Sequence, residues 1–164
     1  MDEPEKRFDE TLKKLGLDRL PCDLMHRALS CIHIPIGGDE KIYLGDHRKP
    51  NGVYVERAVE RALQLYALLP SPPDLIRMDL EDGTRCQKAD LSPEQLRKLF
   101  REIVRAEIDP AGHDILVGNV YFLDTRNQIL FQLYDDRDAY VAAADPAMLE
   151  SLINFKNALL IHDK

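Results

Sequence analysis

The sequence has no tryptophan, few cysteines and no long hydrophobic run. A membrane-spanning helix needs roughly 18 or more consecutive apolar residues, and no segment approaches that length. The three cysteines are odd in number and form no Cys-x-x-Cys pair, which argues against a disulfide framework and against a zinc ribbon. The chain also opens without a cationic segment followed by an apolar run. We therefore expect no secretory signal and predict a cytoplasmic location.

Common catalytic motifs are missing as well. Gly37-Gly38 is followed by acidic residues and lacks the Gly-x-x-x-x-Gly-Lys spacing of a phosphate-binding loop. The histidines are widely spaced, whereas zinc ligands are usually close together in the sequence. A cysteine–histidine nucleophile would need Cys31 with His33, or Cys86 with His113, and neither pair lies in a segment resembling a nucleophile elbow. The sequence thus predicts no catalytic residue, no metal centre and no cofactor.

The net charge of −7 is concentrated in the C-terminal third of the chain. Residues 1–105 hold 19 acidic and 18 basic residues, whereas residues 106–164 hold 10 acidic and 4 basic residues. An acidic surface repels nucleic acid and anionic lipid and favours cationic partners or metal ions, although a mild negative charge also serves solubility alone. We therefore expect no nucleic-acid binding and no membrane binding. The short basic segment 47–51 precedes a predicted helix, where it forms either a solvated loop or an anion contact.

Composition and hydrophobic periodicity predict one folded domain over residues 1–164. Helices are expected at 4–15 and at 52–69, and a short helical turn is expected at 22–30. Two more helices are expected to begin at Ser92-Pro93-Glu94-Gln95 and at Asp145-Pro146. Strands are expected at 32–36, 41–44, 75–80, 115–124, 128–134 and 140–143. The first two strands are expected to pair as a hairpin around Gly37-Gly38, and Pro35 should place its strand at a sheet edge.

The order of these elements predicts an α+β fold. Strands come in adjacent groups with hairpin-length links, and helices are interspersed between the groups. This arrangement favours a central antiparallel or mixed sheet with helices packed mainly on one face. The hairpin and strand of segment 115–143 are rich in β-branched and aromatic residues, so the hairpin strands should lie at the sheet centre.

Segment 119–143 is the most distinctive part of the chain. One strand carries Tyr121-Phe122, and a second hydrophobic strand ends in Leu133-Tyr-Asp-Asp-Arg137. These residues resemble a bacterial family known as domain of unknown function 3885, in which the second strand ends in Leu-Tyr-Asp-Asp-Arg-Gly. Asp138 stands at the glycine position, and aspartate is among the few residues that tolerate a positive φ. The resemblance implies a small cytosolic protein and supplies no catalytic residue.

The acidic residues of this segment have two interpretations. Asp135, Asp136 and Asp138, with Asp124 across the hairpin, are the one carboxylate cluster suited to a divalent cation. Alternatively, the aspartates accept hydrogen bonds from their own backbone turn, and Arg137 neutralises the corner by pairing with a carboxylate.

Two classes of function remain open. The first is a non-enzymatic protein-binding domain, for example an immunity-type protein that neutralises a basic bacterial toxin domain through an acidic surface. Its predicted partner-binding residues are Tyr134, Asp135, Asp136, Arg137, Asp138 and Tyr140, a combination of tyrosines and charges that is common at interfaces. The alternative is a small metal-assisted enzyme using Asp124, Asp135 and Asp136, or a regulatory domain that binds a ligand at the same corner. We expect a monomer or a weak homodimer.

Overall fold

The structure is a computed structural model that describes residues 3–17, 30–45, 49–80, 83–108 and 116–162. The helices are α1 (Glu3–Lys14), α2 (Gly52–Ala67), α3 (Pro93–Ile108) and α4 (Glu150–His162), with a 3₁₀ helix η3 (Pro146–Leu149) directly before α4. The strands are β1 (Cys31–Pro35), β2 (Tyr43–Leu44), β3 (Lys49–Pro50), β4 (Leu75–Leu80), β5 (Gly83–Lys88), β6 (Leu116–Asp124), β7 (Ile129–Leu133) and β8 (Asp138–Ala143). None of the described helices is both long enough and apolar enough to cross a membrane.

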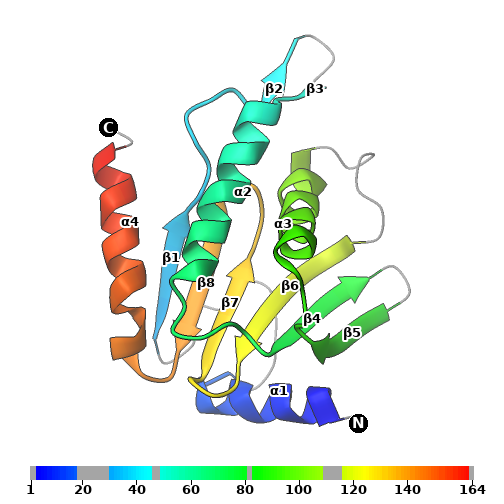
Figure 1. Cartoon of the computed structure of the whole chain (residues 1–164), viewed down its shortest axis with the longest axis vertical. Helices are drawn as coiled ribbons and strands as arrows, with labels where there is room; N and C mark the ends of the chain where they lie inside the picture. Colours follow the sequence, from blue (N-terminus) through cyan, green and yellow to red (C-terminus); the bar gives the residue numbers. More distant parts are fainter. Residues whose placement is uncertain (1–2, 18–29, 46–48, 81–82, 109–115, 163–164) are drawn as a thin grey trace.

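Six strands form one sheet in the order β1-β8-β7-β6-β4-β5, and every neighbouring pair is antiparallel (Figure 1). The hairpin strands β6 and β7 lie at the centre of this sheet, as their composition predicted, and β8 lies between β7 and β1. β1 forms one edge of the sheet, which agrees with the presence of Pro35 in that strand. The α+β fold predicted from the sequence is confirmed.

Helices cover both faces of the sheet, but unequally (Figure 1). The larger core lies between the sheet and helices α2, α3 and α4, and it contains the four rings of Tyr66, Phe100, Phe122 and Phe131. A smaller core on the other face holds residues of α1 against the sheet, for example Phe8 and Leu12. Helices therefore pack mainly on one face, as predicted.

The starts of the helices are fixed by side chains that accept hydrogen bonds from the first turn. Asn51 Oδ1 accepts from the N–H of Val53 at 3.1 Å at the start of α2. Before α3, Ser92 Oγ accepts from the Gln95 N–H at 3.1 Å and Gln95 Oε1 accepts from the Ser92 N–H at 2.8 Å, and the two bonds form a capping box. At the start of η3, Asp145 Oδ1 accepts a hydrogen bond from the N–H of Ala147 at 3.0 Å.

The predicted hairpin between 32–36 and 41–44 is wrong. β1 pairs with β8, and β2 pairs with β3 in a separate two-stranded ribbon. The reason is that the chain after β1 is held by another element: the N–H of Ile36 donates to the carbonyl of Arg137 at 2.8 Å. Gly37-Gly38 therefore continues along the corner between β7 and β8 instead of reversing the chain.

One further difference concerns a strand with a weak sequence signal. β5 was not predicted, because its sequence Gly-Thr-Arg-Cys-Gln-Lys is polar and its strand lies at the second sheet edge. The helical turn predicted at 22–30 lies, except for Ser30, outside the described residues.

Candidate functional site

The predicted partner-binding residues include a tight turn at 134–137, between β7 and β8. Asp135 Oδ1 accepts hydrogen bonds from the backbone N–H groups of Arg137 at 2.9 Å and Asp138 at 2.8 Å. The side chain is buried, with 8% of the residue exposed. Aspartate stabilises turns in this way, because its carboxylate replaces backbone acceptors that the turn cannot supply. The carboxylate of Asp135 thus holds the turn and does not face solvent.

Asp136 ties the same corner to α2. Its Oδ2 accepts a hydrogen bond from the Tyr54 hydroxyl at 2.7 Å, and both residues are buried. Burial, followed by the hydrogen bond to Asp136, raises the pKa of Tyr54, so its hydroxyl stays protonated and donates. Gly37 packs against this contact: a Cβ there would lie 3.0 Å from Tyr54 Oη and 3.2 Å from Arg137 Cγ. The signature residues therefore join β7, β8, α2 and the segment after β1.

The two remaining charged residues of the corner face outward. Arg137 is exposed, and no described carboxylate lies within ion-pair distance of its guanidinium, so it does not neutralise the aspartates as the sequence suggested. Asp138 Oδ1 lies 2.5 Å from Nε2 of His33 on β1. Asp138 is the first residue of β8, and its φ is not positive. Among the described non-glycine residues only Gln128 has a positive φ, at 57°. The family glycine position thus requires no left-handed backbone in this chain.

Two tyrosines complete a group of residues from β1, from β8 and from the turn between β7 and β8. The Tyr134 and Tyr140 rings meet edge to face with centroids 5.9 Å apart, and the His33 ring lies 5.1 Å from that of Tyr140. Tyr134 is 40% exposed, and its exposure is among the largest for a described hydrophobic residue. We define the tyrosine surface as His33, Tyr134, Arg137, Asp138 and Tyr140.

The burial of Asp135 makes the stability of the protein depend on pH. Burial raises the pKa of Asp135, and the hydrogen bonds from the backbone of Arg137 and Asp138 offset only part of this effect. Because its pKa is raised in the folded state, Asp135 stabilises the fold at pH values below its ordinary pKa of 3.8. This stabilisation is lost as the pH rises through the pKa that Asp135 has in the folded state.

We expect Asp135→Asn to be as stable as the wild type or more stable at pH 7, because asparagine keeps the accepting oxygen without the charge. The advantage should vanish below pH 4. Asp135→Ala is the control, since it loses both hydrogen bonds and should cost about 1–2 kcal/mol at either pH. Urea denaturation at several pH values measures this, and an Asn variant as unstable as the Ala variant would contradict the assignment.

Asp124 lies at the other end of the hairpin. It is paired with Ile129, the first residue of β7, whereas Asp135 lies two positions beyond Leu133, the last residue of that strand. At about 3.3 Å per residue, the two carboxylates are separated by roughly 20 Å. The four carboxylates considered as a divalent-cation cluster therefore do not come together, and the described residues contain no group of three or more His, Cys, Asp or Glu side chains that could hold a metal ion. The metal-assisted alternative lacks the converging carboxylates that it requires.

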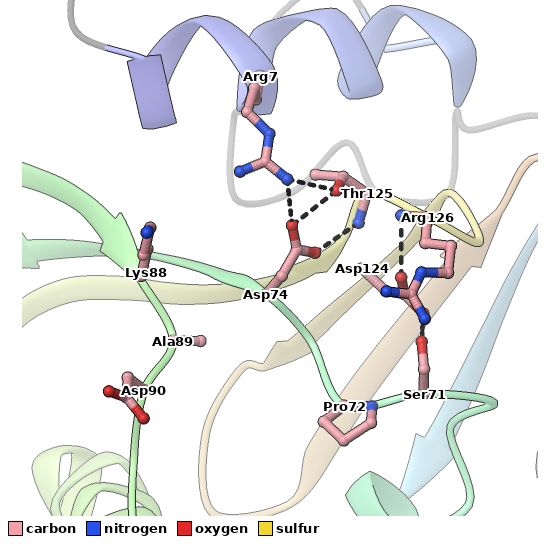
Figure 2. A pocket seen from close by; sticks show the side chains of 10 residues that line it. All are labelled: Arg7, Ser71, Pro72, Asp74, Lys88, Ala89, Asp90, Asp124, Thr125 and Arg126. Carbon is pink, nitrogen blue, oxygen red and sulfur yellow. Dashed lines mark hydrogen bonds and ion pairs between the residues drawn. The ribbon is translucent and has the colours of Figure 1, made fainter.

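Asp124 instead forms part of a pocket of about 590 Å³ at its end of the sheet (Figure 2). We call this the sheet-end pocket; it lies between Arg7 of α1 and the segments around Ser71, Lys88 and Asp124. Figure 2 shows Arg7 reaching from α1 toward the segment before β4 and the β6–β7 turn. Sequence reasoning missed this pocket because its walls are far apart in the chain: Arg7 and its partner Thr125 are separated by 118 positions.

Comparison with known proteins agrees with the signature segment. A family model described as Domain of unknown function (DUF3885) matches residues 6–163, nearly the whole chain. The chain belongs to the DUF3885 family. No curated protein and no solved structure matches the chain. The family predicted from the sequence is thus confirmed, and the match covers nearly the whole chain.

In this DUF3885 member, the side chains of Cys31 and His33 contact other groups, although both residues lie on β1. Cys31 Sγ contacts the carbonyl oxygen of Ile32 at 3.8 Å, while the His33 ring bonds Asp138. Burial raises the pKa of Cys31 to about 11, so its sulfur is a thiol at neutral pH and a poor nucleophile. The second pair involves His113, which lies outside the described residues.

Proposed function

We propose that this chain is a non-enzymatic protein-binding domain that contacts its partner through the tyrosine surface. The observation that supports this is the edge-to-face pair of the exposed Tyr134 and the half-buried Tyr140, next to the turn that Asp135 holds. Tyrosine supplies a large contact area together with a polar hydroxyl, and it is enriched at the residues that dominate binding energy. Because Asp135 holds the turn, little rearrangement of this surface is needed on binding.

The partner class that we propose is a basic bacterial toxin domain, which the chain would neutralise as an immunity-type protein in the cytoplasm. The net charge of −7 would accelerate association with a basic partner by electrostatic steering. The free thiols Cys31 and Cys86 suit a reducing compartment. Asp135 and Asp136 contribute to this field from beneath the surface, and the acidic side chain at the contact itself is Asp138.

The test begins with capture of a partner from host lysate by the immobilised wild-type chain, followed by measurement of the dissociation constant with the purified partner. We expect Tyr134→Ala/Tyr140→Ala to weaken binding by about 30-fold, the factor that corresponds to the loss of about 2 kcal/mol. Leu68→Ala is the control, because Leu68 is 37% exposed at the end of α2 and should have no effect.

Charge reversal at Asp135 or Asp136 would test folding instead of binding, since both residues are buried. Arg137→Glu is a better probe of the electrostatics, because this side chain faces solvent. A basic partner should bind this variant faster than it binds the wild type, mainly at low salt. A double tyrosine variant that binds as tightly as the wild type, or a wild type that captures no stoichiometric partner, would overturn the proposal.

A further inference from the structure

We propose that the sheet-end pocket binds a small organic anion through carboxylate or phosphate oxygens. This site is at the opposite end of the sheet from the tyrosine surface, and it does not depend on the protein-binding proposal. Its volume of about 590 Å³ lies within the range of small-molecule sites, roughly 300–1,000 Å³.

The carboxylates at the base of the pocket are already satisfied. Asp74 accepts hydrogen bonds from Arg7 Nη2 at 2.6 Å, from the Thr125 N–H at 2.7 Å and from Thr125 Oγ1 at 2.6 Å. Asp124 is 2% exposed and accepts four hydrogen bonds, including one from Ser71 Oγ at 2.6 Å. These bonds join α1, the segment before β4 and the β6–β7 turn, so the walls are fixed before any ligand arrives.

The polar groups that remain available are mainly donors. The bonds that Arg7 makes to described residues all use Nη2, which leaves its other N–H groups for a ligand. Lys88 and Arg126 are exposed, and their side chains have no hydrogen-bond or ion-pair partner among the described residues. Guanidinium groups match the geometry of carboxylate and phosphate oxygens, and a lysine adds a mobile positive charge. The complementary ligand is therefore rich in acceptors.

Two other features of the lining limit the kind of anion. Pro72 and Ala89 supply apolar surface, which suits an organic molecule better than a bare ion. Asp90 is exposed at the lining and, within the described residues, its carboxylate accepts no hydrogen bond. Its charge opposes a polyanion, so the pocket suits a molecule with one or two negative charges.

Titrations of the ¹⁵N-labelled protein with succinate and with inorganic phosphate, each matched for ionic strength with sodium chloride, test this proposal. We expect saturable shifts of the Ala89, Thr125 and Arg126 amide signals. Shifts with succinate alone would assign a carboxylate ligand, shifts with phosphate alone a phosphate ligand, and shifts with both the shared chemistry. The absence of saturable shifts with either anion would overturn the site.

Lys88→Ala/Arg126→Ala should weaken the binding by about tenfold, the loss expected when two exposed charged contacts are removed. Both side chains are exposed, so the fold should be kept. The control is Lys41→Ala/Lys98→Ala, which removes the same charge from exposed positions outside the pocket. Equal weakening in both double variants would show a general charge effect and would also overturn the site.

Discussion

Replacing Phe131 with alanine is expected to lower the free energy of unfolding by about 3–5 kcal/mol. Phe131 is fully buried in a central strand, and its ring centroid lies 5.8 Å from that of Phe122, 5.9 Å from Tyr66 and 6.1 Å from Phe100. The variant would lose the transfer free energy of the ring and leave a cavity whose walls are three other rings. These rings come from β6, α2 and α3, and therefore cannot close the gap together.

Urea denaturation measures this loss as a lower midpoint with an unchanged slope. The total stability of a domain is about 5–15 kcal/mol, so the variant should lose a large fraction of it. Tyr134→Ala is the matched control, because it removes an exposed aromatic ring just beyond the same strand and should cost about 1 kcal/mol or less. A loss below that of the control would show that the aromatic cluster does not organise the core.

Replacing Asp124 with alanine is expected to cost about 3 kcal/mol or more, although the residue lies in a turn. The carboxylate accepts hydrogen bonds from Ser71 Oγ, Asn127 Nδ2 and the backbone N–H groups of Arg126 and Asn127, at 2.6–3.1 Å. Alanine would leave these donors without an acceptor in a place that water enters poorly, since Asp124 is 2% exposed. The neighbouring Gln128 would also lose support for its positive φ.

Asp145→Ala provides the comparison, because Asp145 accepts one hydrogen bond at an exposed helix start and should cost about 1 kcal/mol. Thermal unfolding of both variants, at one pH and one salt concentration, would rank them. If the Asp124 variant is no less stable than the Asp145 variant, the hydrogen bonds at Asp124 do not hold the hairpin to the segment before β4.

Local sequence patterns were sufficient to predict the elements that are stabilised by contacts between residues close together in the chain. α2 and α3 were predicted from apolar periodicity, and their caps Asn51 and Ser92 also act locally, because each cap bonds residues within one turn. The β6–β7 hairpin was predicted for a similar reason. The strands are hydrophobic, the turn is short, and cross-strand partners such as Phe122 and Phe131 are close in the chain.

Long-range contacts decided what the sequence did not reveal. The Asp-Asp-Arg-Asp segment has the composition of a solvated corner, but Asp136 is buried by Tyr54, which is 82 positions away. The sheet-end pocket is another example, because Arg7 meets Asp74 across 67 positions. In both cases an ordinary charged residue acquires its role from a partner in a different element, and no local pattern marks that partner.

The pairing of β1 with β8 determines when this fold can be completed during synthesis. His33 and Asp138, which bond across the two strands, are 105 positions apart. β1 leaves the ribosome well before its partner strand, because the segment that separates the two strands must be made first. Pairings over such distances slow folding, and an unpaired strand is a template for aggregation in the meantime. The strand made first is thus among the last to join the sheet, and any chain that ends before β8 leaves it exposed.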